Sequence, residues 1–167
     1  MASTYTPIAT TTLGSAQSSV TFSTISGSYT DLVLVVSAAV ATSNDIRLRF
    51  NSDTGNNYST TILYGTGSAA GSARVSSESS ILTDYYATPT STLGNSAHII
   101  SIQNYSNSTT YKTTLSRSNA AGTGVDATVG LWRSTSAITS LTLICGSTGS
   151  INFNTGSTFT LYGIKAA

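Results

Sequence analysis

Residues that favour turns recur along this chain about every ten positions, so every regular element must be short. The segments between them are rich in Val, Ile, Thr and Tyr, which favour strands. Nowhere does an apolar spacing of three and four residues persist over three helical turns. We therefore predict an all-β fold, an antiparallel β-sandwich or jelly roll with about 8–10 strands and negligible helix.

Two segments predict which faces the strands bury. In residues 45–51, apolar residues alternate with Arg47 and Arg49, as in a half-buried strand whose charges face water. Residues 32–36 (LVLVV) are apolar without a break, which predicts a central strand covered on both faces. The full set of predicted strands is 20–25, 31–40, 45–51, 58–64, 79–86, 97–104, 111–117, 125–133, 138–145 and 158–164.

The N-terminal residues differ from the rest of the chain. They contain Pro7 and few apolar side chains, and such a segment needs a neighbour to become ordered. We predict an extended N-terminal arm over residues 1–16 and a single β-sandwich domain over residues 17–167. A chain of 167 residues is long enough to bury a core without a metal or a disulfide.

Composition excludes several partners. Only 8% of residues are charged and the net charge is +1, so neither nucleic acid nor an anionic membrane is expected as a partner. Serine and threonine take the place of charged residues on the surface. The chain shows neither a secretory signal nor an apolar run long enough for a membrane span, which predicts synthesis in the cytoplasm without export. The lone Cys145 ends an apolar run and is predicted to be buried and inert.

Residues for catalysis or metal binding are scarce, and no cofactor is expected. His98 is the one imidazole that can act as a general base, and it directly precedes strand residues, where an ordinary hydrogen-bonding histidine is the simpler interpretation. The acidic residues lie at predicted strand starts and turns rather than in a catalytic pair. Asp53, in the NSDTGNN turn, is a weak metal candidate because it is the turn's only anionic residue. We predict no catalytic residues and a non-enzymatic protein.

The aromatic residues leave two alternatives open. In the first, several aromatic rings are exposed together and stack on sugars. In the second, they belong to the core of the sandwich or to a subunit interface, both of which use Tyr and Trp heavily. Trp132 and Arg133, at a predicted strand end, suit an interface anchor. The aromatic residues in question are Tyr58, Tyr64, Tyr85, Tyr86, Tyr105, Tyr111 and Trp132.

Several stretches, read in order, carry a family resemblance. They are TYTPIATTTLGS, SGSYTDLVLVV, LRFNSDTGNNYSTTILYG, QNYSNSTTYKTTLSRSN, VGLWRSTSAITSLTL and GSTFTLYGIKAA. With them the chain resembles, from Tyr5 to Ala167, small virion proteins of tailed bacteriophages, frequent among cyanophages and phages of other aquatic bacteria. The most specific pieces are NYSNSTTYK, GLWRSTSAI and FTLYGIK.

The resemblance implies a structural role on the surface of the phage particle and supplies no catalytic residues. Related sequences occur both as stand-alone proteins and as fibre-end domains. Since the chain carries no coiled-coil or repeat shaft, we expect a capsid cement or decoration protein, with a tail-fibre or adhesin domain that binds host glycan as the alternative. The expected partners are further copies of itself, as a homotrimer, and the major capsid protein or other virion proteins. Tyr5, Pro7 and Ile8 of the arm are expected to contact the capsid.

Overall fold

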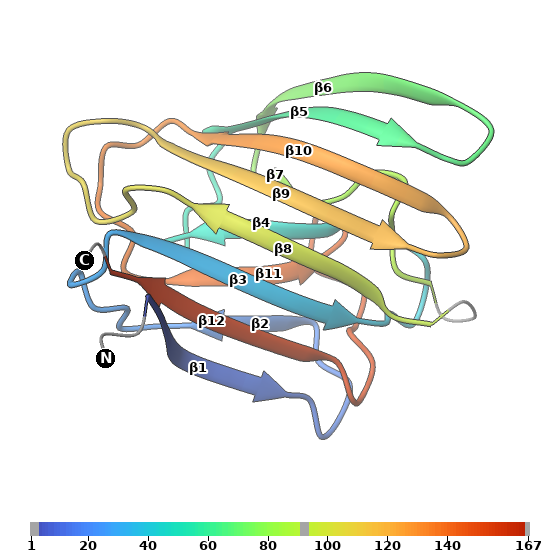
Figure 1. Ribbon diagram of the computed structural model, residues 1–167, viewed down its shortest axis with the longest axis horizontal. Helices are drawn as coiled ribbons and strands as arrows, with labels where there is room; N and C mark the ends of the chain where they lie inside the picture. Colours follow the sequence, from blue (N-terminus) through green and yellow to red (C-terminus); the bar gives the residue numbers. More distant parts are fainter. Residues whose placement is uncertain (1–3, 91–93, 166–167) are drawn as a thin grey trace.

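The computed structural model describes residues 4–90 and 94–165, which form two antiparallel sheets packed face to face (Figure 1). One sheet has eight strands and the other four, and no helix occurs in the described ranges. The strands are β1 (Tyr5–Thr12), β2 (Ser19–Phe22), β3 (Asp31–Ala38), β4 (Ile46–Phe50), β5 (Tyr58–Gly65), β6 (Ala70–Glu78), β7 (Ile81–Leu82), β8 (Ser96–Ile102), β9 (Lys112–Ala120), β10 (Gly124–Trp132), β11 (Leu141–Cys145) and β12 (Thr158–Ile164). The predicted antiparallel β-sandwich is confirmed, with 12 strands instead of 8–10.

The strand order is nested. The larger sheet runs β1-β12-β3-β8-β9-β10-β5-β6 and the smaller one β2-β11-β4-β7. Strand β1 therefore pairs with β12, β2 with β11, β3 with β8, and β4 with β7. A long antiparallel ribbon folded over on itself has this nesting.

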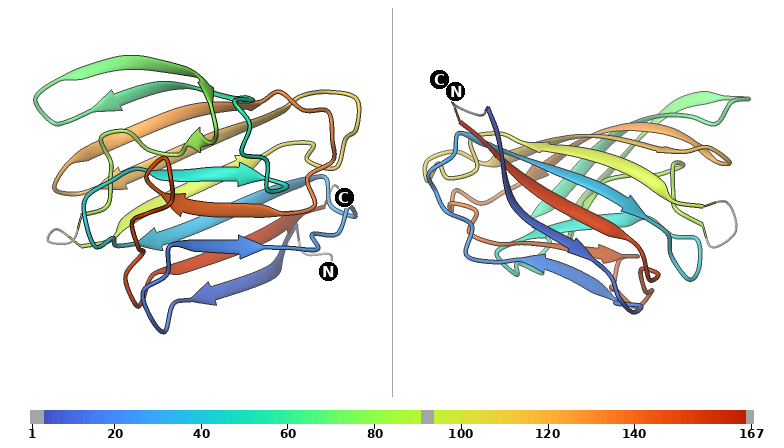
Figure 2. Two further views of the ribbon diagram at one scale, coloured as in Figure 1. Left: turned by 180° about the vertical axis from the view of Figure 1, so that it is seen from behind. Right: turned by 60° about the horizontal axis from the view of Figure 1, so that its bottom comes forward.

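Two hairpins widen the larger sheet beyond these nested pairs. The β5–β6 hairpin is inserted between β4 and β7 in the sequence, and the β9–β10 hairpin is inserted between β8 and β11. The two hairpins join because all of β5 pairs with β10. Seen from behind, the β5–β6 hairpin extends past the edge of the smaller sheet (Figure 2). The larger sheet therefore has more surface than the smaller sheet can cover.

The hydrophobic core lies between the two sheets and follows the alternation of the strands. On β4 the apolar residues are fully buried and Arg47 and Arg49 lie on the opposite side, as the sequence predicted. The expectation that these charges face water is wrong for Arg47, whose side chain is only 12% exposed because ion pairs with Asp45 and Glu78 cover it. Leu32 and Leu34 of β3 are also fully buried, but Val35 is 39% exposed. The prediction that β3 is covered on both faces is therefore wrong for this chain alone, because its second face is left exposed at Val35.

Three other segments differ from the predictions. Instead of a free arm, Tyr5–Thr12 forms edge strand β1, because its backbone pairs with β12 despite few apolar side chains; residues 1–3 lie outside the described ranges. Residues 70–78, which lie between two predicted strands, form β6, since the cross-strand register with β5 outweighs their Gly and Ser content. The strand predicted over 79–86 shrinks to β7, and its remainder is a loop stabilised by side-chain hydrogen bonds.

Candidate interaction surfaces

The side of the larger sheet that faces away from the smaller sheet carries exposed aliphatic side chains on five adjacent strands. We call this surface, on β3, β8, β9, β10 and β5, the outer face. Its aliphatic side chains are 39–62% exposed, well beyond the scattered exposure that is usual for surface aliphatics. They are Val35, Leu63, Ile99, Leu115, Val125 and Val129.

Strand β10 points its more polar side toward the interior, and β9 turns the hydroxyls of Thr114 and Ser116 inward while Leu115 lies outside with Arg117 and Asn119. On β10, Val125 and Val129 are exposed, whereas Asp126 and Thr128 are buried. On β9, Leu115 is exposed between buried residues of polar character. This is the reverse of the usual arrangement, in which one sheet face is polar and wet and the other apolar and buried.

The inward polar side chains bind the backbone of β7 and the loop after it. Thr128 Oγ1 donates to the carbonyl of Leu82 at 3.2 Å, and Ser116 Oγ donates to the carbonyl of Thr83 at 3.1 Å. The backbone N–H of Leu82 donates to Thr60 Oγ1 at 3.1 Å. The polar row of β9 and β10 is therefore needed inside, which leaves their aliphatic row outside.

Asp126 holds the loop after β7. Its Oδ2 accepts hydrogen bonds from the backbone N–H groups of Tyr85, Tyr86 and Ala87 at 2.7, 2.9 and 2.7 Å. The carboxylate is 5% exposed. Three donors converging on one buried oxygen give charge-assisted bonds, so Asp126 acts as the anchor of this loop.

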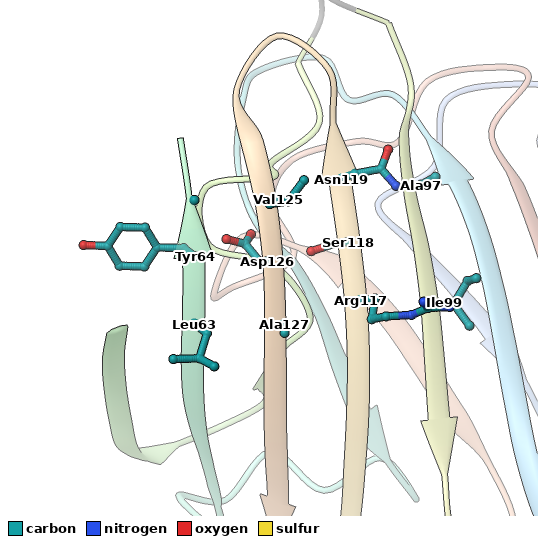
Figure 3. Close-up of a pocket in the computed structure, with 11 residues that line it drawn as sticks. Leu63, Tyr64, Ala97, Ile99, Arg117, Ser118, Asn119, Val125, Asp126 and Ala127 are labelled. Carbon is teal, nitrogen blue, oxygen red and sulfur yellow. The ribbon is translucent and has the colours of Figure 1, made fainter. Parts of the chain in front are cut away.

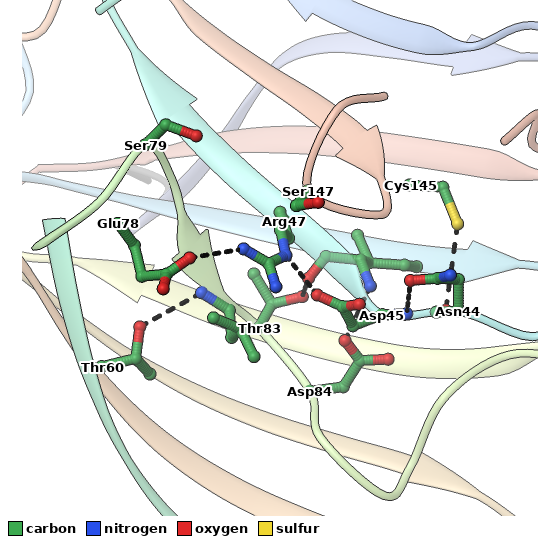
Figure 4. Close-up of polar contacts among 12 residues, drawn as sticks. Asn44, Asp45, Arg47, Thr60, Glu78, Ser79, Thr83, Asp84, Cys145 and Ser147 are labelled. Atoms are coloured by element: carbon green, nitrogen blue, oxygen red, sulfur yellow. Dashed lines mark hydrogen bonds and ion pairs between the residues drawn. The ribbon is translucent and has the colours of Figure 1, made fainter. Parts of the chain in front are cut away.

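A second group of charged residues surrounds Arg47 (Figure 4). Its guanidinium forms ion pairs with Asp45 and, from Nη1 to Oε2 at 3.0 Å, with Glu78. Asp84, fully buried nearby, accepts a bond from the backbone N–H of Ile46 at 2.7 Å. Burial above all, and then the charge of Asp45, raises the pKa of Asp84 well above its usual value. These contacts join β4 to the segment around β7 and serve the fold.

A shallow depression of about 640 Å³ lies on the outer face across β8, β9, β10 and β5 (Figure 3). Leu63, Ile99 and Val125 line it from three strands, and Arg117 and Asp126 are the charged residues among its lining residues. The Asp126 carboxylate is engaged by the loop after β7. The lining is mostly apolar, without converging acid and base groups. It suits contact with another apolar surface better than chemistry on a small substrate.

His98 lies within β8, with its side chain in the interior. Ser96 Oγ is 2.8 Å from Nε2 and Thr83 Oγ1 is 3.4 Å from Nδ1, and burial lowers the pKa of His98 to about 3. The residue is 1% exposed. A substrate cannot reach the imidazole in this position, and the prediction of an ordinary hydrogen-bonded histidine is confirmed.

Trp132 belongs to the core, which corrects the expectation that it anchors an interface. It is 2% exposed and stacks on Tyr58 with ring centroids 6.2 Å apart. Its Nε1 donates to Asp53 Oδ2 at 2.7 Å. Arg133 is half-buried and donates to the carbonyls of Asn56 and Tyr58. Its role at an interface stays a prediction.

Asp53 acts as the acceptor that closes its turn. Besides Trp132, the backbone N–H of Gly55 and the side-chain amide of Asn57 donate to it. Burial alone raises its pKa, but the bonds from these three donors outweigh that effect and lower the pKa below its usual value. Within the described ranges, no three His, Cys, Asp or Glu residues gather in a group that can hold a metal ion.

The predicted capsid-contact residues lie on the edge strand β1. Tyr5 is 56% exposed and meets Tyr162 of β12 edge-on, with ring centroids 6.2 Å apart. Pro7 is exposed, and Ile8 packs partly against the core. A register shift between Pro7 and Ala9, together with the proline, is a common protection of an edge strand against unwanted pairing.

Three of the seven aromatic residues considered for sugar binding come together. Tyr64 of β5 lies 4.4 Å from Tyr86 and 5.7 Å from Tyr85, measured between ring centroids. Tyr85 and Tyr86 are 39% and 40% exposed. Tyr58, Trp132 and Tyr105 are buried instead. Sequence reasoning had no means of separating these two groups, because burial is decided by distant strands.

Comparison with known proteins gives no family assignment. Neither a scan of the sequence against protein-family models nor a search of curated proteins finds a match. No helix of the described chain is long and apolar enough to span a membrane.

Proposed function

We propose that the chain is a non-enzymatic structural protein of a bacteriophage virion, a capsid cement or decoration protein that coats the head by self-association and capsid contacts. The observation that carries this proposal is the outer face, an apolar sheet surface that the chain leaves uncovered. A surface of this kind marks a site of protein association. The low charge of the chain allows identical copies to lie close together without strong repulsion.

The candidate residues for chemistry support the non-enzymatic part of the proposal. His98 is enclosed by hydroxyl groups, Asp53 closes a turn, and Asp126 holds a loop. Each of them has a structural task that explains its presence. A hydrolase needs such groups to be exposed together beside a substrate.

The nested strand order favours a jelly roll for this cement protein. A homotrimer on local three-fold axes of the shell suits a compact sandwich with a neutral surface. Tyr5, Pro7 and Ile8 on edge strand β1 are available for contact with the major capsid protein. A variant with Tyr5→Ala and Pro7→Ala is expected to bind capsids more weakly while keeping its fold.

Cryo-electron microscopy of the phage that encodes the chain tests the location. We expect density for the sandwich on the capsid lattice at or near three-fold positions, in hundreds of copies. Density confined to the tail contradicts the cement proposal. A knock-out phage whose heads are as resistant to heat as the wild type also contradicts a stabilising role.

The tail-fibre alternative rests on the cluster of Tyr64, Tyr85 and Tyr86. Asp126 binds the backbone N–H groups of Tyr85 and Tyr86, and these two residues are 39% and 40% exposed. The cluster can therefore offer a stacking surface to a host glycan. A glycan array with the wild type and with Tyr86→Ala tests it. Binding that disappears in the variant supports the adhesin, and no binding to any glycan removes it.

A further inference from the structure

We propose that the outer face is the surface through which copies of this chain associate, so that its aliphatic row is buried against the same row of a second copy. The inference rests on the proposed structural function, because it names the partner at that apolar surface. It predicts which residues control the oligomeric state.

The first argument is that the fold uses the other side of these strands for polar contacts. Thr60, Ser116, Thr128 and Asp126 bind the backbone around β7 from within. A shift of β10 by one residue, which moves its valines inside, removes the bonds that Thr128 and Asp126 make. The apolar row is therefore directed outward by the fold itself, and its exposure is costly in an isolated chain.

The second argument comes from β3. Residues 32–36 are apolar on both faces, a pattern typical of strands covered on both sides. One face lies in the core, where Leu32 and Leu34 are fully buried. The other face, with Val33 half-buried and Val35 39% exposed, belongs to the outer face. An occupant on the outer face gives β3 the environment that its sequence predicts.

The size of the patch can be set against that of a known interface. Five strands about 4.8 Å apart span roughly 19 Å, and the six-residue rise from Val125 to Leu131 along β10 adds roughly 20 Å in the other direction. This outline covers roughly 400 Å², and its aliphatic side chains share it with Thr61, Thr113, Arg117 and Asn119. A standard protein interface buries about 800 Å² on each partner, so the outline supplies about half of such an interface and the surface around it supplies the rest.

The charge of the outer face favours a second copy as the occupant. Arg117 lies within the outline of the patch, paired in register with Ile99 on one side and Ala127 on the other. Asp31, at the start of β3, is the one carboxylate on the outward rows of these five strands, so the face has one cation and one anion and favours neither a basic nor an acidic partner. The surface that an aliphatic row matches best is another aliphatic row, and antiparallel sheets stack face to face readily. Two faces can meet across a two-fold axis, or three around a three-fold axis.

A charge-pair variant tests the inference. Leu115 and Val129 face each other in register on β9 and β10, so Leu115→Lys with Val129→Glu places an ion pair on the outer face that needs no partner. Sedimentation velocity at micromolar concentrations should show the wild type as a dimer or trimer and the variant as a monomer. We expect association to weaken by about 100-fold or more.

The matched control carries the same two charges on the other sheet. Thr21 and Thr142 face each other in register on β2 and β11, on the outside of the smaller sheet, with their hydroxyls 2.9 Å apart. Thr21→Lys with Thr142→Glu should leave the oligomer unchanged. Leu63→Glu, at the most exposed aliphatic position of the patch (62%), provides a second test if the charge pair does not fold. Circular dichroism and the fluorescence of Trp132 report folding.

The outcomes separate this inference from the proposed function. A wild type that is monomeric overturns the inference, as does an oligomer that survives both outer-face changes. If that monomer still binds phage heads, the cement proposal stands and the face contacts the capsid protein instead. If the oligomer depends on the outer face but no copies are found on phage heads, the inference stands and the cement proposal fails.

Discussion

Removal of the Asp126 carboxylate should release the loop after β7. In Asp126→Ala, three backbone N–H groups lose their acceptor, and each bond to a charged group contributes about 1.5–3 kcal/mol. The simple sum is too large, since Tyr85 and Tyr86 are partly exposed and their amides can reach water, whereas Ala87 is fully buried. Loss of a buried charge also recovers some desolvation energy. We therefore expect a loss of about 3 kcal/mol in unfolding free energy, with a fall in Tm of about 10 °C.

Urea denaturation followed by the fluorescence of the single tryptophan, Trp132, measures this loss. Asp126→Asn keeps one acceptor oxygen without the charge, and about half the loss is expected. Asp31→Ala is the control, because Asp31 accepts one backbone N–H, from Asn104 at 2.7 Å, in an exposed setting. A loss below about 1 kcal/mol in Asp126→Ala would refute the reasoning. It would mean that water or the burial cost of the carboxylate cancels the three bonds.

Three further predictions concern buried residues. Burial lowers the pKa of His98 from 6.5 to about 3, so between these values the unfolded chain binds a proton that the folded chain lacks, and stability falls as pH drops below about 6.5. Urea titrations should show the wild type losing about 3 kcal/mol of unfolding free energy by pH 4 relative to His98→Gln. A difference between the two proteins that does not change with pH contradicts this. Gly130→Ala brings a methyl group within 2.4 Å of Ile81 Cγ2, and calorimetry should show a destabilisation of about 1–3 kcal/mol. Burial, with nearby carboxylates, raises the pKa of the Cys145 thiol to about 12, so a maleimide should label it in urea but not in the folded protein. Rapid labelling of the folded protein disproves the burial of this thiol.

The sequence predicted the class of fold because its strongest signals are local. The alternation in residues 45–51 gives β4, and the turn residues that follow it end the strand where expected. Strand β1 escaped prediction because its stability comes from backbone pairing with β12, near the other end of the chain. Pairing partners so distant leave no trace in the composition of the segment itself.

The direction in which β10 faces was beyond sequence reasoning. Its alternation is clear, but the aliphatic row points outward and the row with Asp126 and Thr128 points inward. The choice depends on the backbone around β7, which needs acceptors and donors from β9 and β10. Trp132 was placed at a surface for a similar reason, since its partners Tyr58 and Asp53 are distant in sequence.

The nested strand order has a consequence for synthesis on the ribosome. Thr12 pairs with Thr158, and β2 pairs with β11, so the first strands made must wait for nearly the last. At 5–20 residues per second, β1 stays without its partner for roughly ten seconds or more. The innermost pairs, β4 with β7 and β3 with β8, can close earlier, and the sandwich is completed from its middle outward. During this interval the unpaired early strands are open to pairing with other nascent chains, and the proline and bulge of β1 limit that hazard.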